Sequence, residues 1–445
     1  MSYPAQTNPD QATQDRAPTT SSAGGGLRGA ARERAIAQFR RLAGQQVDGV
    51  PFRLVPPDGN AIDFGTGEPA FTVRVHDNDG LDALGSADAL TIAHAYMDGK
   101  IDFDGDLLEM LRYQELLRDA HPGVHIWRRL HPILVGRPRV NPQWIALHYD
   151  AQNAQLHVSD HDWHTYTPGI YLTDDEELEP AATRKLQAAF DGLQLKPGQH
   201  LLEAGCGWGG MTRFSAQRGV RVTGITLSQR QKEYVEQKIA EEKLPAKVLY
   251  QDFFTFQPAE KFDAISMMGV IEDLSDYRLV MRSLARWLKP GGRVYLDFAA
   301  ERRRFDTHSF VTQHIWPGTF RMVFMPEFME AVRESPFELM RIDNDRRNYH
   351  LWAKQMYLRW TRQRDEVVAQ HGERLWRMFL LLFVAVSAML DRRSHTSTAF
   401  RVLLELPADT DGKFRTAWHV KLRDAVEGGA RALRDGLLKL WPAKG

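Results

Sequence analysis

An acidic side chain and a run of glycines follow one another in the segment LLEAGCGWGG, residues 201–210. Glu203 precedes Gly205, Gly207 and Gly209. Glycines allow a sharp backbone turn and a close approach to a ligand, and the start of a following helix favours negatively charged groups. The spacing does not match the dinucleotide motif GxGxxG, and ordinary strand-to-helix turns also use glycine. The segment therefore predicts a binding loop, with a purely structural turn as the alternative.

Two further strand-like stretches end in residues that suit a nucleoside. The residues at the first strand end are Thr226, Leu227 and Gln231, and those at the second are Gln251, Asp252 and Phe253. The first set offers a hydroxyl and an amide to a ribose, and the second offers a carboxylate and a ring to an adenine. No phosphate-binding lysine accompanies the glycine loop. Together, the three strand ends indicate a nucleoside ligand, not a nucleoside triphosphate.

A carboxylate also stands near the end of the strand-like segment GGRVYLDFAA, residues 291–300. An isolated buried carboxylate is costly, so Asp297 should be paired, solvated or chemically active. A structural ion pair with Arg302, Arg303 or Arg304 is one interpretation, and a catalytic role is the other.

The elements that would position these residues form a regular series. Five strand-like segments alternate with helical ones: HLLEAG (200–205), VRVTGITL (220–227), AKVLYQD (246–252), FDAISMMG (262–269) and GRVYLDFAA (292–300). This alternation predicts an α/β fold with a mostly parallel sheet that is covered by helices on both faces. Ligands of such sheets bind at the carboxyl ends of the strands.

The chain divides into four predicted regions. Residues 1–28 are rich in Pro, Ser, Thr, Gln and Gly and are predicted as a disordered tail. Residues 29–140 mix strand and helix patterns, which predicts a small N-terminal α+β domain. The larger domain is predicted at 141–406. Residues 407–445 show helical spacing of basic and apolar residues and predict an amphipathic helical tail, which could lie on a membrane, pack on a partner or stay solvated.

Composition narrows the class of protein. Lys and Arg together number 57, as do Asp and Glu, so no net charge draws the chain to nucleic acid. The single cysteine, Cys206, excludes an internal disulfide framework and a cysteine-rich zinc site, and no metal site is expected. The N-terminus lacks a signal-peptide pattern, and the apolar run 378–390 is shorter than the ~20 residues that span a bilayer. We expect a cytoplasmic protein, with peripheral attachment to the inner face of a membrane as an alternative.

Several motifs together resemble those of cyclopropane-fatty-acyl-phospholipid synthases and the related mycolic acid methyltransferases, which use S-adenosylmethionine. The matching segments are LLEAGCGWGG, GITLSQRQ, LYQDF, MGVIEDLSDY, HYD with Asn153, YTPG at 166–169, HIWPGT, NYH at 348–350, ERLWRMF and FRVLLELP. Residues 50–120 also resemble the extra N-terminal domain of the longer members. The resemblance covers most of the chain and implies a class I methyltransferase, Rossmann-like in its fold.

The resemblance also implies the cofactor contacts. Gly205, Gly207 and Gly209 would cradle the methionine part, and Tyr166 and Thr167 would close over it. Thr226, Leu227 and Gln231 would meet the ribose, and Gln251, Asp252 and Phe253 the adenine. Glu203 matches the acidic residue of the family before the glycine loop, where it is either a ligand contact or a carboxylate that stabilises the turn.

The resemblance is incomplete where the chemistry would take place. In the family, bicarbonate acts as the base, and a cysteine, a glutamate, a histidine and a tyrosine hold it. Glu272 and Tyr349 match the glutamate and the tyrosine, but Pro168 and Asp297 stand at the cysteine and histidine positions, and Asp273 replaces a further histidine. Two carboxylates would repel another anion, which makes bicarbonate a doubtful ligand. We expect Asp297 to replace bicarbonate as the base or as a counter-charge, and burial beside Glu272 to raise the pKa of one of the two carboxyl groups.

The predicted function is methyl transfer from S-adenosylmethionine to unsaturated acyl chains of phospholipids at a membrane surface. A cyclopropane, a methylene branch or a methyl branch would result. The alternatives are a methyltransferase of a small apolar metabolite and a cofactor-binding homologue without catalysis. The chain could also form a homo-oligomer.

Overall fold

The computed structural model describes residues 33–37, 40–41, 50–110, 162–274, 276–302, 309–315, 322–391, 394 and 396–409. The predicted N-terminal tail, the predicted C-terminal helix from residue 410 and the HYD motif lie outside these residues.

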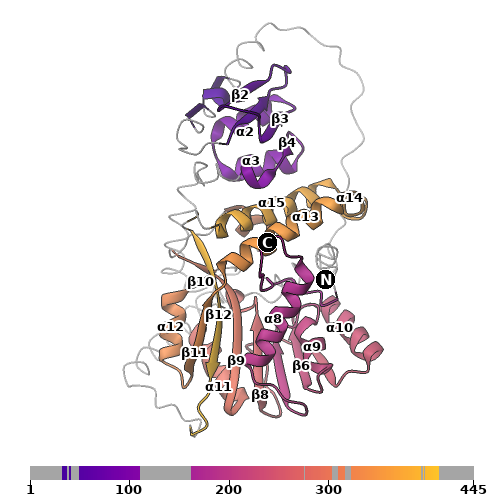
Figure 1. Ribbon diagram of the computed structural model, residues 1–445, viewed down its shortest axis with the longest axis vertical. Helices are drawn as coiled ribbons and strands as arrows, with labels where there is room; N and C mark the ends of the chain where they lie inside the picture. The colour runs from indigo at the N-terminus through magenta and orange to yellow at the C-terminus, as the bar shows by residue number, and fades with distance from the viewer. Residues whose placement is uncertain are drawn as a thin grey trace, which may run out of the picture.

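A sheet of eight strands forms the centre of the larger domain (Figure 1). Its order is β11 (Glu338–Asn344), β12 (Ser397–Glu405), β9 (Leu288–Glu301), β8 (Phe262–Met268), β5 (His200–Ala204), β6 (Arg221–Thr226) and β7 (Ala246–Tyr250), with β10 (Val323–Phe324) beside β9. Each neighbouring pair from β9 to β7 is parallel, whereas β12 runs antiparallel to β9 and β11. The predicted class I α/β fold is confirmed, with two antiparallel strands at one edge that the sequence patterns did not identify.

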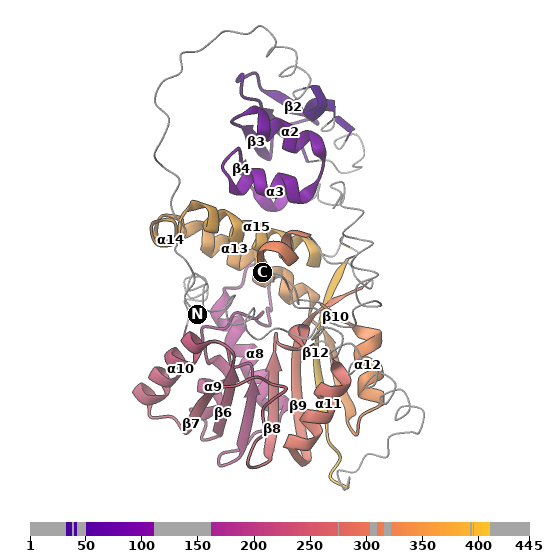
Figure 2. The same ribbon diagram turned by 180° about the vertical axis from the view of Figure 1, so that it is seen from behind.

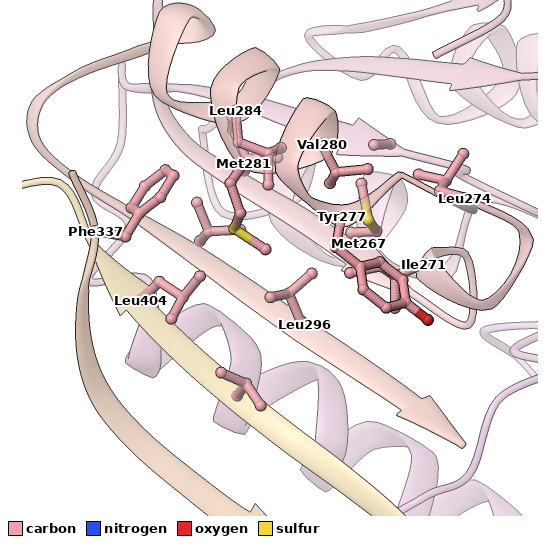
Figure 3. Close-up of a cluster of buried hydrophobic side chains, with 14 of the residues drawn as sticks. Met267, Ile271, Leu274, Tyr277, Val280, Met281, Leu284, Leu296, Phe337 and Leu404 are labelled. Atoms are coloured by element: carbon pink, nitrogen blue, oxygen red, sulfur yellow. The ribbon is translucent and has the colours of Figure 1, made fainter. Parts of the chain in front are cut away.

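Helices cover both faces of this sheet. They are α8 (Leu178–Gly192), α9 (Gly210–Ala216), α10 (Gln229–Glu242), α11 (Tyr277–Trp287) and α12 (Met325–Arg333). Successive strand residues point to opposite faces: Leu201 packs with residues of α8 and α9, and Leu202 packs with residues of α11 and α12. Figure 3 shows the second cluster, where Met281 and Leu284 of α11 lie over Leu296 of β9. Every residue of β5 is therefore buried, as are most residues of β8.

The N-terminal region forms a small α+β unit. Its sheet has the order β2 (Ile62–Phe64), β1 (Phe52–Val55), β3 (Phe71–Val75) and β4 (Ile101–Gly105), with α2 (Asn78–Ser86), α3 (Ala89–Met97) and α4 (Leu107–Met110). The side chains of Asp77 and Asp88 cap the N-termini of α2 and α3 by accepting hydrogen bonds from backbone N–H groups. The α+β prediction for this region is confirmed in the part that is described.

A helical layer lies between this unit and the large sheet (Figures 1 and 2). It contains α13 (Arg346–Arg362), α14 (Arg364–His371) and α15 (Glu373–Leu390), beside the short helix η3 (Val311–Ile315). Arg377 of α15 holds the N-terminal unit by an ion pair with Asp102 at 2.6 Å and a hydrogen bond to the carbonyl of Tyr96 at 3.0 Å. The apolar run 378–390 lies within α15 and is largely buried, and no described helix is long and apolar enough to cross a membrane.

Candidate active site

The glycine loop connects β5 to α9 in backbone conformations that favour glycine. Gly205, Gly207 and Gly209 have φ angles of 76°, 52° and 85°. A Cβ atom on Gly205 would collide with Val270, and one on Gly209 would lie 2.8 Å from Val235 Cγ1. A Cβ atom on Gly207 would meet nothing within 4 Å. Two of these glycines therefore permit close packing, and Gly207 leaves open space for a ligand.

The loop borders a cavity of about 170 Å³ at the carboxyl ends of β5, β6 and β7. The predicted cofactor residues that line it are Tyr166, Thr167, Glu203, Gly205, Gly207, Thr226, Leu227, Gln231, Gln251, Asp252 and Phe253. Gly209 is not among the lining residues, because it begins α9 and packs on Val235. All three predicted strand ends therefore meet in one cavity, as a nucleoside cofactor requires.

Local hydrogen bonds fix the polar groups on the two later strand ends. The Thr226 hydroxyl donates to Gln231 Oε1 at 2.7 Å and accepts from the Ser228 N–H at 3.1 Å. Asp252 Oδ1 accepts from the backbone N–H of Phe254 at 2.8 Å and of Thr255 at 3.2 Å. These bonds hold the side chains in place before any ligand binds.

Glu203 is buried, and its side chain contacts both the helix after the glycine loop and the cavity. It accepts a hydrogen bond from the Thr212 hydroxyl of α9, and it also lines the cavity. Burial raises its pKa to about 8. Both interpretations of Glu203 therefore have a structural basis.

Asp297 lies fully buried near the end of β9 and has two side-chain partners. Its Oδ1 accepts a hydrogen bond from the Tyr349 hydroxyl at 2.7 Å, and its Oδ2 lies 3.2 Å from the Lys185 ammonium group. Burial keeps the pKa of Tyr349 well above its ordinary value, so its hydroxyl remains a donor. The ion-pair partner is thus Lys185, not Arg302, and the other two arginines considered lie outside the described residues.

Lys185 is a site residue that the motifs did not reveal. It occupies the buried side of α8 together with Ala181, Ala182 and Ala189. A lysine at helical spacing within an apolar stripe would have been the signal, because a buried ammonium group needs a partner.

Glu272 lies in η2 (Ile271–Asp273), directly after β8. Its Oε1 accepts from the Ala299 N–H at 2.9 Å, and its Oε2 meets no partner among the described residues. Burial raises the pKa of Glu272 to about 8, and the charges of Asp273 and Asp297 act in the same direction. Glu272 is therefore mostly protonated at neutral pH. The neighbouring Asp273, to which no role was assigned, lines the cofactor cavity, and burial raises its pKa to about 7.

Aromatic rings connect the cofactor cavity to a large apolar cluster on α13 and α15. The rings of Tyr166 and Trp352 meet edge to face at 5.5 Å, and Trp352 lies 6.4 Å from the Tyr349 ring. Trp352 belongs to the cluster, as do Trp360 and Trp376, whose indole N–H groups each donate to the other's carbonyl. Trp360 and Trp376 therefore brace the cluster, whereas Trp352 faces the site.

Comparisons with known proteins identify related chains. Residues 138–398 match the family model described as mycolic acid cyclopropane synthetase, and residues 44–120 match a domain of unknown function. The chain is 25% identical over 363 residues to a sphingolipid C9-methyltransferase of Komagataella phaffii, covering 76% of this chain and 73% of that protein. It is 26% identical over 353 residues to a probable fatty acid methyltransferase of Pseudomonas putida, covering 74% and 87%.

A solved structure shares the fold. The mycolic acid cyclopropane synthase CmaA1, complexed with SAH and CTAB, has a TM-score of 0.55 and 22% sequence identity. The match covers 60% of this chain and 99% of that one.

Proposed function

Because the chain belongs to the mycolic acid cyclopropane synthetase family and is an S-adenosylmethionine-dependent methyltransferase, we propose that it methylates a carbon of an unsaturated acyl chain in a phospholipid. When bound, the cofactor supplies an electrophilic methyl group on a sulfonium. The observation that carries the proposal is a buried carboxylate, Asp297, which accepts a hydrogen bond from Tyr349 and whose backbone carbonyl accepts one from Gly269, a residue that lines the cavity. Gly207 and the neighbouring strand ends would hold the cofactor.

The electron balance of the reaction assigns a task to each group. The π pair of the alkene would form the bond to the methyl carbon that the cofactor supplies, the methyl–sulfur pair would stay on sulfur, and the neighbouring acyl carbon would become positive. Asp297 then accepts a proton from the added methyl group, and the released C–H pair closes a cyclopropane ring. If a hydride first moves from the methylated carbon to the cationic carbon, loss of the same proton forms a methylene double bond instead. A saturated methyl branch would also need a reductant and is not part of the proposal. The ring faces of Trp352 and Tyr166 would stabilise the cation.

Asp297 suits the role of base better than Glu272 does. A base must offer a lone pair to the proton, and the Asp297 carboxylate already acts as an acceptor, for the Tyr349 hydroxyl at 2.7 Å. Glu272, with a pKa of about 8, is mostly protonated at neutral pH and can donate a hydrogen bond through its carboxyl group. Glu272 would therefore orient a reactant but would not remove a proton.

The choice of a lipid substrate has two supports. Tyr166 of the cavity contacts Trp352 of the apolar cluster on α13 and α15, so this side of the site has the apolar surroundings that a hydrocarbon chain requires. The two relatives reported above are named for methylation of sphingolipids and of fatty acids.

The test uses the full chain, the cofactor and vesicles of either unsaturated or saturated phospholipid. We expect the unsaturated fatty acids alone to gain the mass of one CH2, measured by mass spectrometry after hydrolysis. Vesicles with an unsaturated sphingolipid and a soluble phenol or amine are the competing substrates. Methylation of the soluble compound, with the lipids unchanged, would contradict the proposal and favour a small-metabolite methyltransferase. Cofactor binding without any turnover would indicate a non-catalytic homologue.

Asp297→Asn tests the chemistry directly. Loss of the base should lower kcat by about 100- to 10,000-fold, with the affinity for the cofactor product nearly unchanged. Removing bicarbonate from the buffer should leave the parent's activity unchanged, because ionised Asp297 disfavours a second anion. A requirement for bicarbonate would show that the carboxylate has not replaced it.

A further inference from the structure

Lys185 is a fully buried lysine that the proposed chemistry does not itself use. Its ammonium group donates to the Thr167 hydroxyl and lies 3.2 Å from Asp297 Oδ2. Its charge also opposes the burial that raises the pKa of Glu203 and of Asp345. Apolar residues of similar volume often replace a buried ion pair with no loss of stability. The presence of this cation therefore requires an explanation besides packing.

The Thr167 contact joins Asp297 to the cofactor cavity. Thr167 lines that cavity, and a Cβ atom on Gly269 would lie only 2.8 Å from Thr167 Cγ2, so the two residues pack tightly. The Gly269 N–H in turn donates to the Asp297 carbonyl at 2.8 Å. Lys185, Thr167, Gly269 and Asp297 thus form a closed ring of contacts at the ends of β8 and β9.

We propose that Lys185 is a positioning residue that places its positive charge beside the Asp297 carboxylate, fixes the orientation of that carboxylate and ties it to Thr167 at the cofactor cavity. This inference rests on the proposed function. The Tyr349 hydroxyl bonds Oδ1 and Lys185 bonds Oδ2, so each oxygen keeps a further lone pair that can accept the substrate proton. That proton moves from the substrate C–H bond to Asp297, and Lys185 keeps its own protons throughout.

Other ionisable groups around the pair must be taken into account in its pH dependence. Those whose charges act on Asp297 or Lys185 are Glu272 on η2, Tyr295 on β9, Asp345 and Tyr349 at the start of α13, Arg401 on β12 and Glu203 on β5. Arg401 pairs with Asp345 at 2.8 Å, which leaves Lys185 as the cation bonded to Asp297.

The first measurement compares Lys185→Met with the parent on unsaturated phospholipid vesicles. Methionine keeps the unbranched apolar stem and removes the charge. We expect kcat to fall about 100-fold while KM for the lipid and calorimetric affinity for S-adenosylhomocysteine change by less than about threefold. The acidic limb of the kcat profile should move to higher pH by about 1 to 3 units, because a neighbouring positive charge is lost.

The second measurement does not depend on turnover. Difference infrared spectra at the pH of that limb should show the C=O band of a protonated carboxyl group in Lys185→Met where the parent lacks it. The band should disappear in Lys185→Met/Asp297→Asn.

Three variants serve as controls. Lys289→Met breaks another lysine–aspartate pair, with Asp263 at 2.8 Å, in the opening residues of β8 and β9 and should leave kcat and the limb unchanged. Lys185→Arg keeps the charge and should keep the limb in place even if its bulk lowers kcat. The double variant Lys185→Met/Asp297→Asn removes both charges, so it tests the inference even if Lys185→Met does not fold. It should be no slower than Asp297→Asn alone, because residues that act through one another are not additive.

The outcomes separate the two proposals. A parent-like kcat with an unshifted limb in Lys185→Met, or a further large loss in the double variant, would overturn the positioning role and leave the proposed function standing. An active Asp297→Asn protein would remove the base itself, whatever the Lys185 variants do.

Discussion

Replacing Glu272 by glutamine should make the folded protein more stable at pH 8 than the parent. The physical reason is burial, which raises the pKa of Glu272 from its ordinary 4.5 to about 8 in the folded protein. Between these two values the unfolded chain loses a proton that the folded protein retains, so the stability of the parent falls as the pH rises. Below pH 4.5 both states are protonated, and the penalty is absent. Glutamine is neutral throughout and keeps the oxygen that accepts from the Ala299 N–H.

The magnitude follows from the pKa difference. The values of about 8 and 4.5 differ by about 3.5, and each unit corresponds to about 1.4 kcal/mol. Relative to the parent, the variant should therefore gain up to on the order of 5 kcal/mol in free energy of unfolding between pH 4.5 and pH 8. Glu203 is present in both proteins and cancels in this difference, whereas Asp273, whose charge acts on Glu272, cancels only in part.

The assay is urea unfolding followed by fluorescence at a series of pH values. Glu330→Gln is the matched control, because Arg333 lowers the pKa of Glu330 to about 2 and its stabilising effect is lost only in acid. The free energy of unfolding of Glu330→Gln should be slightly lower than that of the parent, opposite in sign to the effect of Glu272→Gln. If the difference in free energy of unfolding between Glu272→Gln and the parent did not change with pH, the reasoning would be refuted. Glu272→Gln should also keep kcat within about tenfold at neutral pH, since it mimics the protonated carboxyl group.

Two further predictions concern the cavity and its apolar border. Gly207→Asn should weaken the binding of S-adenosylhomocysteine, measured by calorimetry, by more than about tenfold without loss of the fold. Asparagine tolerates the positive φ, and its side chain would occupy the open space at Gly207. Unchanged affinity would remove the loop from the site. Trp352→Leu should raise KM for the lipid and leave cofactor affinity unchanged, because it removes ring contacts to Tyr166 and Tyr349 but no residue that lines the cavity. An unchanged KM would show that Trp352 does not contact the acyl chain.

The parallel strands and the glycine loop could be predicted from the sequence. Apolar strand segments, helical spacing and the glycines after β5 are local patterns that can be read from the sequence. The rule that ligands bind at the carboxyl ends of parallel strands then predicts where the cavity lies. The strands β11 and β12 could not be predicted in this way. Most of β11 is exposed, and its position depends on antiparallel pairing with β12.

The sequence by itself therefore determined the fold class, the cofactor cavity and the presence of a carboxylate near the end of β9. Only the tertiary structure decided what surrounds that carboxylate. Lys185 precedes Asp297 by 112 positions, and the two meet because α8 packs on the sheet beside β9. Only the structure also assigns the raised pKa to Glu272, because desolvation depends on which side chains enclose the group in three dimensions.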